Sequence, residues 1–234
     1  MIDIHAHILP GIDDGARTLA DSVEIVRWLS MQGVTDVIVT PHFVDETIYV
    51  SPRQDNLKLL KDLKEKIAEE GIKVNLYLGN EIYINSKIEE LIKEKTISTM
   101  ADSKYLLVEL PINGRDDHHE DYLKDLIDKG YKVILAHPER YAFLQEDYEA
   151  AKELFDMGLL FQCNLRSILG KYGSGAKKTV KKMIKDGLVF TFSTDIHHVG
   201  RKNDIELAQK KLSKYYDEKE LKKLLVSNPG KLLR

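Results

Sequence analysis

Hydrophobic and polar positions follow a repeating order along the chain: an amphipathic stretch, a glycine, and then a short apolar run. This order recurs at Gly33, Gly71, Gly130, Gly158 and Gly187. A glycine directly after a helix supplies the left-handed backbone that closes the last turn, so each instance predicts a helix, a stop and a strand. Including the chain start and one run without a preceding glycine, seven strands are predicted, at residues 2–7, 36–40, 74–78, 105–108, 133–136, 160–163 and 189–193.

Apolar residues at helical spacing predict helices between these strands. One series begins at Leu19, and another follows Ser51 and Pro52, which are suited to the N-cap and the first helical position. Strands that alternate with helices imply a parallel sheet buried on both faces, either open and doubly wound or closed into a barrel. No Gly-x-Gly-x-x-Gly follows the first strand, which disfavours a dinucleotide-binding fold.

Length and composition narrow the class of protein. The 234 residues fit one domain, 1–234, with a large core. The net charge of −3 argues against a nucleic-acid partner, and no apolar run approaches the roughly 20 residues that membrane insertion needs. A single cysteine, Cys163, excludes an internal disulfide. Because the first strand starts at residue 2, we expect no signal peptide and a cytoplasmic protein.

Two histidines one residue apart, His5 and His7, lie on the first predicted strand. Residues i and i+2 of a strand point to the same face, so the two imidazoles should project together. Two converging imidazoles supply half of the ligands of a transition-metal site. The alternative interpretation of His5 and His7 is a polar strand end near the surface.

Other polar residues follow the predicted strands at their carboxyl ends. They are His42, Glu81, Glu109, His137, Asp195 and His197, and Asp14 lies in the first loop. In a parallel barrel these ends meet at one face, where active sites lie. Helix capping and ordinary loop polarity are the alternative explanation for each residue taken singly.

The charge of such a cluster predicts metal ions. Buried carboxylates repel one another and cost desolvation, so four carboxylates among five histidines require cations. Three divalent ions against four carboxylates leave a charge of about +2, which attracts a phosphate dianion. Two-metal sites favour hydrolysis because the ions activate water and stabilise the transition-state oxygens.

The run Met-Ile-Asp-Ile-His-Ala-His-Ile-Leu-Pro-Gly-Ile-Asp-Asp-Gly-Ala resembles the opening of the polymerase-and-histidinol-phosphatase (PHP) superfamily. Within it, the run is most similar to the manganese-dependent protein-tyrosine phosphatases of bacterial capsule and exopolysaccharide operons. The resemblance continues in order through Thr40-Pro41-His42, Gly79-Asn80-Glu81-Ile82, Val108-Glu109-Leu110-Pro111, Ala136-His137-Pro138-Glu139-Arg140 and Ser193-Thr194-Asp195-Ile196-His197. It spans nearly the whole chain.

This resemblance implies an α/β fold, a distorted seven-stranded parallel (β/α) barrel of TIM-barrel-like form. It also implies three divalent ions, manganese first, with iron, zinc, cobalt or magnesium as alternatives. The first ion would take His5, His7, Glu81 and Asp195. The second would share Glu81 and add Glu109 and His137. The third would take Asp14, His42 and His197.

Two phosphate-binding arginines are also implied. Arg140 matches one directly, and pairing with Glu139 or a loop acid is its structural alternative. The other falls after Asp195, where Arg201 is our candidate, although Lys202 occupies the family spacing.

The implied activity is that of a metal-dependent protein-tyrosine phosphatase. Its implied substrate is a phosphotyrosine-bearing bacterial tyrosine kinase that controls polysaccharide export. Two alternatives stay open: a small-molecule phosphomonoesterase such as a histidinol phosphatase, and a non-catalytic metal-binding PHP module like those appended to DNA polymerases.

Four residues outside these motifs also carry reactive or metal-binding side chains. His118 and His119 are expected in a solvated polar loop. His198 could touch substrate or face solvent. Cys163 lacks an arginine six positions on, so no thiol-phosphatase loop surrounds it, and we expect a buried structural thiol.

Overall fold

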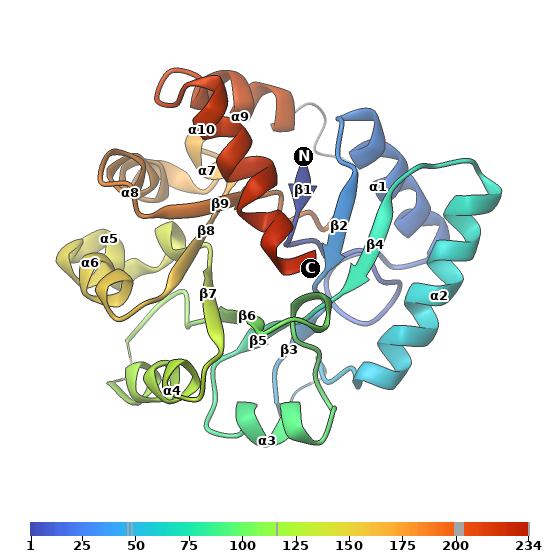
Figure 1. The fold of residues 1–234 in the computed structure, drawn as a ribbon, viewed down its shortest axis with the longest axis horizontal. Helices are drawn as coiled ribbons and strands as arrows, with labels where there is room; N and C mark the ends of the chain where they lie inside the picture. The colour runs from blue at the N-terminus through green and yellow to red at the C-terminus, as the bar shows by residue number, and fades with distance from the viewer. Residues whose placement is uncertain (46, 48, 116, 199–203, 234) are drawn as a thin grey trace.

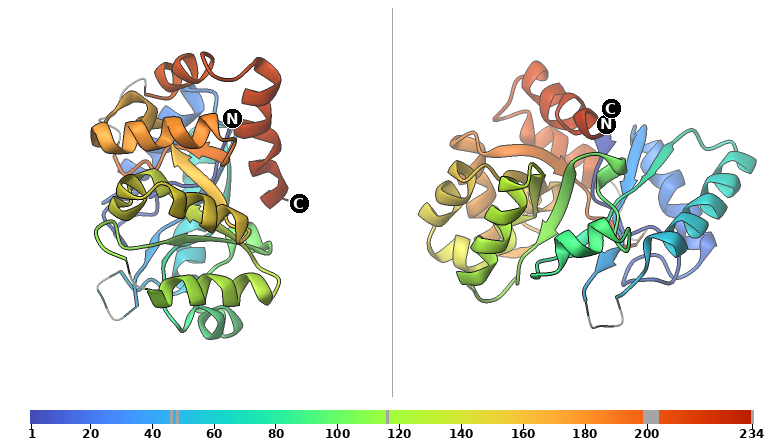
Figure 2. Two further views of the ribbon diagram at one scale, coloured as in Figure 1. Left: turned by 90° about the vertical axis from the view of Figure 1, so that its left-hand side faces the viewer. Right: turned by 60° about the horizontal axis from the view of Figure 1, so that its bottom comes forward.

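The structure is a computed structural model that describes residues 1–45, 47, 49–115, 117–198 and 204–233. Its strands occupy the middle of the molecule and its helices surround them (Figure 1). The C-terminal segment packs beside the start of the chain (Figure 2), where Gly230 approaches Ile2. None of the described helices is both long enough and apolar enough to cross a membrane.

The strands of the described residues form two parallel sheets. One sheet has the order β1-β2-β4 and the other β3-β5-β6-β7-β8-β9. The strands are β1 (Ile2–Asp3), β2 (Asp36–Val39), β3 (His42–Phe43), β4 (Asn75–Leu78), β5 (Glu81–Tyr83), β6 (Tyr105–Glu109), β7 (Lys132–Ala136), β8 (Leu160–Asn164) and β9 (Val189–Ser193). The predicted α/β class with parallel strands is therefore confirmed.

The strand count differs from the seven predicted, because two predicted strands continue as a second short strand in the other sheet. β3 follows β2 after Thr40 and Pro41, and β5 follows β4 after Gly79 and Asn80. Proline has no N–H to donate to a ladder, which interrupts the first pair. At Gly79 a Cβ would lie 2.8 Å from the Met100 sulfur and 3.0 Å from an Ile38 methyl carbon, so the close packing favours glycine there.

The first and last strands approach each other without forming a continuous ladder. Ala6 and Ile196 make an isolated parallel bridge. The Asp195 N–H donates to the His5 carbonyl, and the His7 N–H donates to the Ile196 carbonyl, both at 2.9 Å. The described residues thus show two sheets joined by a bridge, and the closed seven-stranded barrel is not confirmed.

The helices alternate with the strands as the apolar spacing predicts. They are α1 (Leu19–Met31), α2 (Arg53–Glu69), α3 (Ile88–Lys93), α4 (Asp117–Asp128), α5 (Ala142–Glu146), α6 (Glu149–Asp156), α7 (Leu165–Leu169), α8 (Gly173–Lys185), α9 (Asp204–Leu212) and α10 (Glu218–Lys222), with short turns η1 (Met100–Asp102), η2 (Pro138–Arg140), η3 (Lys223–Ser227) and η4 (Pro229–Leu233). All five predicted stop glycines have positive φ, from 67° to 108°. One detail was wrong: Pro52, not Ser51, is the N-cap of α2, and it makes no side-chain cap bond.

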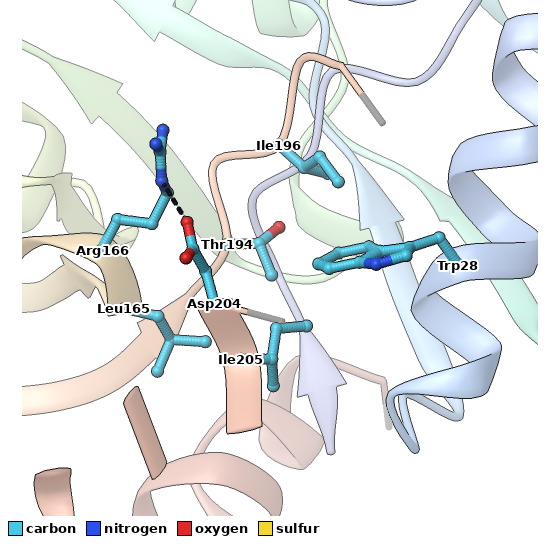
Figure 3. Close-up of a pocket in the computed structure, with 7 residues that line it drawn as sticks. All are labelled: Trp28, Leu165, Arg166, Thr194, Ile196, Asp204 and Ile205. Atoms are coloured by element: carbon cyan, nitrogen blue, oxygen red, sulfur yellow. Dashed lines mark hydrogen bonds and ion pairs between the residues drawn. The ribbon is translucent and has the colours of Figure 1, made fainter. Parts of the chain in front are cut away.

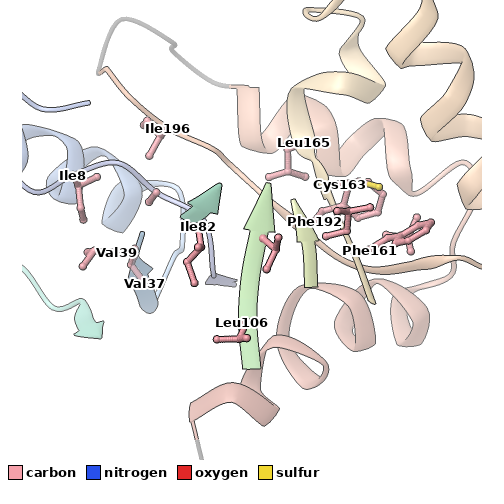
Figure 4. Close-up of a cluster of buried hydrophobic side chains, with 14 of the residues drawn as sticks. Ile8, Val37, Val39, Ile82, Leu106, Phe161, Cys163, Leu165, Phe192 and Ile196 are labelled. Atoms are coloured by element: carbon pink, nitrogen blue, oxygen red, sulfur yellow. The ribbon is translucent and has the colours of Figure 1, made fainter. Parts of the chain in front are cut away.

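Alternate residues of the central strands face two separate cores. On β6, Leu107 belongs to a small cluster among the strands, whereas Leu106 and Val108 belong to the large cluster under the helices. Figure 4 shows part of the large cluster, in which Cys163 is buried. Leu232 from η4 packs into the small cluster beside Ile2, so apolar side chains fill the space at the strand starts. Polar side chains can therefore gather only at the opposite, carboxyl ends.

Candidate metal centre

A cavity of about 480 Å³ opens at the carboxyl ends of the strands. It is lined by seven of the nine predicted ligands and Arg140, together with Val44, Thr47, Tyr49 and Tyr83. The other two ligands, His5 and His7, are fully buried beneath it. The expected convergence of these side chains on one face is what the structure shows.

The first predicted group is compact. The first strand is shorter than the predicted residues 2–7, because β1 ends at Asp3 and His5 and His7 follow it. Their Nε2 atoms nevertheless lie 3.1 Å apart, as the alternation of side chains along the chain predicts. Both atoms lie within 3.1 Å of Glu81 Oε2. Asp195 Oδ1 is 3.5 Å from each of them. The donor atoms of His5, His7 and Glu81 thus surround one point in the buried floor of the cavity, and Asp195 lies beside the two imidazoles.

The second predicted group adjoins the first through the shared side chain of Glu81, and the third lies on the other side of the cavity floor. His137 Nε2 lies 3.0 Å from the other oxygen of Glu81 and 3.5 Å from Glu109 Oε1. On the other side, Asp14 Oδ1 lies 3.5 Å from His42 Nε2 and 3.3 Å from His197 Nε2.

The grouping by distance is not identical to the predicted assignment. Among the described residues, the donor atoms that all lie within 4.8 Å of one another form three sets: His5, His7 and Glu81; His7, Asp14, His42 and His197; and His42, Glu81 and Glu109. Asp195 and His137, which the predicted assignment gives to the first and second ions, belong to none of these sets.

Several features of this cluster fit divalent cations. Ligand bonds of about 2.0–2.2 Å place the donor atoms of one ion about 3 Å apart, which is the spacing of the first group. His42 Nδ1 and Glu81 Oε2 are buried 3.1 Å apart without hydrogen-bond geometry. Such unsatisfied buried atoms are costly unless a further partner, such as a cation, serves them.

The carboxylates and imidazoles strongly perturb each other. Burial of Glu109, together with the nearby charge of Glu81, raises the pKa of Glu109 to about 8. Burial would lower the pKa of His5, but the carboxylates of Glu81 and Asp195 outweigh it and raise the pKa to about 9. Protons therefore balance the crowded negative charge at neutral pH, and divalent cations would do so in their place.

Two site residues have a left-handed backbone, with φ of 34° at His137 and 51° at Asp195. Histidine and aspartate are among the non-glycine residues that adopt this conformation most often, at a cost of about 1–3 kcal/mol. His137 directly follows β7, Asp195 lies two residues after the end of β9, and both side chains line the cavity.

Sequence reasoning missed the residues that orient the ligands. Asp13 Oδ2 lies 2.9 Å from His7 Nδ1 and also accepts from the His42 N–H. Gln162 Oε1 lies 2.7 Å from His5 Nδ1. Such partners fix which imidazole nitrogen faces a metal ion. The adjacent acids of Asp13 and Asp14 were a visible signal, but nothing in the sequence indicated Gln162.

The loop that carries these two acids packs tightly on the main chain of His7. A Cβ on Gly15 would lie 2.1 Å from the His7 carbonyl oxygen and 2.6 Å from the His7 Cβ. Only glycine permits this approach.

Arg140 lies at the rim of the cavity. Its Nη1 is 3.1 Å from Asp195 Oδ2, and its guanidinium lies 4.6 Å from the centre of the Tyr172 ring. The Tyr172 hydroxyl donates to the same Asp195 oxygen. The candidates for the second arginine position, Arg201 and Lys202, lie outside the described residues.

The remaining candidates lie outside the cavity. His118 and His119 are in the first turn of α4 rather than in a loop, and His118 stacks on Tyr122. His198 is exposed beside the His197 ring. Cys163 is fully buried, and burial raises the pKa of its thiol well above the ordinary value.

A second pocket lies between α1 and α9, lined by residues that include Trp28, Arg166 and Asp204 (Figure 3). Its volume of about 10 Å³ is at most that of one water molecule, so it is no substrate site.

The fold and the cluster together define a class: parallel α/β proteins that gather imidazoles and carboxylates at strand carboxyl ends, as two-metal hydrolases do. The family model described as Capsular polysaccharide synthesis, CpsB/CapC matches residues 1–234. The chain belongs to the CpsB/CapC family, which confirms the resemblance noted in its motifs.

Individual relatives match over almost the whole chain. The chain is 34% identical over 224 residues to CapC of Staphylococcus aureus, covering 94% of this chain and 87% of that protein. It is 31% identical over 235 residues to the tyrosine-protein phosphatase YwqE of Bacillus subtilis, covering 100% and 92%.

Solved structures match as well. One, from work on YwqE of Bacillus subtilis and CpsB of Streptococcus pneumoniae described as unique metal-dependent tyrosine phosphatases, has a TM-score of 0.93 and 31% identity. It covers 100% of this chain and 94% of that chain. A histidinol phosphate phosphatase of Lactococcus lactis, at TM-score 0.59 and 13% identity, covers 92% and 93% and shows the fold alone.

Proposed function

We propose that this protein is a metal-dependent protein-tyrosine phosphatase whose substrate is a phosphotyrosine-bearing bacterial tyrosine kinase of capsule or exopolysaccharide synthesis. The observation that carries the proposal is the cavity in which four carboxylates and five imidazoles meet beside Arg140. Full-length membership of the CpsB/CapC family supports the tyrosine specificity and the link to capsule synthesis.

We propose three divalent ions, manganese first, held as the motifs imply. His5, His7, Glu81 and Asp195 would hold the first, and Glu109 and His137 would join Glu81 at the second. Asp14, His42 and His197 would hold the third. When bound, these ions would activate water and stabilise the charge that develops on the phosphoryl oxygens.

The chain itself would supply orientation and recognition. Arg140 can offer two parallel N–H donors to the phosphoryl oxygens, since its guanidinium is planar and lies at the rim. The phenolate leaving group has a pKa of about 10, so its departure depends less on a strong general acid than that of a serine alkoxide. We propose Arg201 as a second phosphate-binding residue, with Lys202 as the alternative.

Three further proposals concern the whole chain. We propose that residues 1–234 act as one domain and that the two sheets together serve as a distorted seven-stranded barrel. The bridge between Ala6 and Ile196 supports the second idea. We also propose a cytoplasmic location, with which a single buried cysteine, Cys163, is consistent.

The test is a turnover assay of the manganese-loaded protein on phosphotyrosine peptide, phosphoserine peptide and histidinol phosphate, before and after chelation. We expect hydrolysis of the phosphotyrosine peptide that chelation abolishes and manganese restores. His137→Ala should abolish it, and His118→Ala, on α4 outside the cavity, should not. Preferential hydrolysis of histidinol phosphate would indicate the small-molecule enzyme instead. No turnover at full metal content would indicate a non-catalytic module.

A further inference from the structure

The carboxylate of Glu139 is completely buried next to Arg140 in sequence, yet it does not pair with that arginine. Its Oε1 accepts a hydrogen bond from the Asn164 backbone N–H at 2.8 Å and from the Ser167 hydroxyl at 2.6 Å. Both donors lie where β8 passes into α7. Burying a carboxylate costs desolvation free energy, so the two hydrogen bonds to one oxygen indicate that the Glu139 side chain has a specific role at this position.

This carboxylate anchors the turn η2 to the end of β8. The main chain of Glu139 is held as well, because Gln145 Nε2 donates to its carbonyl at 2.9 Å. The turn begins directly after His137, whose backbone is left-handed, and ends at Arg140. Anchoring Glu139 therefore restrains the backbone on which the Arg140 side chain is mounted.

A closed ring of interactions connects Glu139 with the cavity. Asn164, whose N–H binds Glu139, uses its side-chain Nδ2 to donate to Asp195 Oδ2 at 2.7 Å. Arg140 contacts the same oxygen at 3.1 Å. The ring runs from Glu139 through Asn164 and Asp195 to Arg140, and the peptide bond between Arg140 and Glu139 closes it.

We propose that Glu139 is a positioning residue for the reaction, which fixes the Arg140 guanidinium at the place where it meets the phosphoryl group. This inference rests on the proposed phosphatase activity. A role in stability alone predicts that Glu139 acts independently of Arg140. A positioning role predicts that Glu139 matters only while Arg140 is present.

A double-mutant cycle separates these roles. Arg140→Ala should lower kcat/KM for an aryl phosphate by about 10²–10³-fold, the usual loss for one transition-state donor. Glu139→Ala should lower it by about 10–10²-fold, because small displacements of reacting groups cost this much. In the Arg140→Ala background, Glu139→Ala should add no further loss. Independent, multiplicative losses would overturn the proposal.

Two further variants keep the test decisive. Glu139→Gln retains an oxygen that can accept from both donors, so it should recover most of the activity, and a lack of rescue would overturn the proposal. If Glu139→Ala does not fold, Ser167→Ala removes the 2.6 Å donor alone and should cause a smaller loss that also vanishes without Arg140. Thr191→Val is the matched control. Thr191 lies on β9 away from the cavity, and its hydroxyl donates a buried 2.7 Å hydrogen bond to the Leu224 carbonyl, which the substitution removes. It should lower the melting temperature without changing kcat.

Binding of inorganic phosphate to the manganese-loaded protein, measured by calorimetry, gives a readout independent of turnover. Glu139→Ala should weaken phosphate binding as Arg140→Ala does, and the double variant should be no weaker than Arg140→Ala. Unchanged phosphate affinity in Glu139→Ala would overturn the inference. A wild-type protein that binds phosphate but hydrolyses no phosphotyrosine would refute the proposed function instead.

Discussion

Arg140→Ala is the substitution whose effect best distinguishes a phosphate-binding residue from a structural one. Arg140 touches Asp195 at 3.1 Å, and its side chain is 27% exposed. The structural alternative is therefore that Arg140 forms an ion pair with Asp195 and does not bind the substrate. The other alternative, which the sequence suggested, is an ion pair between Arg140 and Glu139. Among the residues that the structure describes, these two form no such pair.

The structure sets the expected size of each effect. Removing the guanidinium leaves Asp195 Oδ2 with the Asn164 amide at 2.7 Å and the Tyr172 hydroxyl at 3.4 Å, so the carboxylate keeps partners. The stability loss should then be about 1 kcal/mol, or a fall in melting temperature of about 2–4 °C for a chain of this length. Loss of one transition-state donor costs about 2.7–4 kcal/mol, or 10²–10³-fold in kcat/KM. The catalytic loss should exceed the stability loss clearly.

The assay measures kcat/KM on a phosphotyrosine peptide, metal content and melting temperature for each variant. Arg140→Lys should recover little activity, because a point charge cannot reproduce the planar fork. Arg166→Ala is the matched control: its guanidinium lies 5.6 Å from the centre of the same Tyr172 ring, but it pairs with Asp204 at 2.8 Å and does not line the large cavity (Figure 3). It should stay close to wild type in kcat/KM. An Arg140→Ala protein that melts early with unchanged kcat/KM would refute the reasoning.

Three further predictions follow from the cluster and the core. Protein purified without chelator should contain more than one transition-metal ion per chain by elemental analysis, and chelation should lower its melting temperature because repelling carboxylates lose their cations; one ion or none in active protein would contradict a two-metal core. Cys163→Ser should keep most activity, and iodoacetamide should react with Cys163 only after unfolding, since burial raises the thiol pKa well above its ordinary value and leaves no thiolate at neutral pH; selective inactivation of native protein would argue for a thiol mechanism. Gly15→Ala should reduce metal content, because the new Cβ would lie 2.1 Å from the His7 carbonyl oxygen. Gly230→Ala is the control and should not reduce it, because the nearest atom to its Cβ would be 3.5 Å away. Equal metal content in the two variants would mean that the loop around Gly15 adapts freely.

The sequence by itself determined the features that depend on local spacing. Apolar runs separated by helices and stop glycines were enough to predict parallel α/β order, because each of these signals acts within a few residues. The seven predicted strands all overlap observed ones. The short spacing between His5 and His7 was likewise enough to predict that their imidazoles converge, because side-chain direction on a strand repeats every two residues.

Only the tertiary structure decided which atoms meet across the sheets. Two short strands that were not predicted, β3 and β5, follow Pro41 and Gly79-Asn80 and pair in the other sheet, and Gly79 there packs against Met100 from a later segment of the chain. The partners that orient the ligands could not be read from the sequence either. Gln162 faces His5 across 157 positions of the chain, and Asn164 reaches Asp195 across 31. A hydrogen bond between distant segments leaves no local pattern, because either residue would look like an ordinary polar side chain on its own strand.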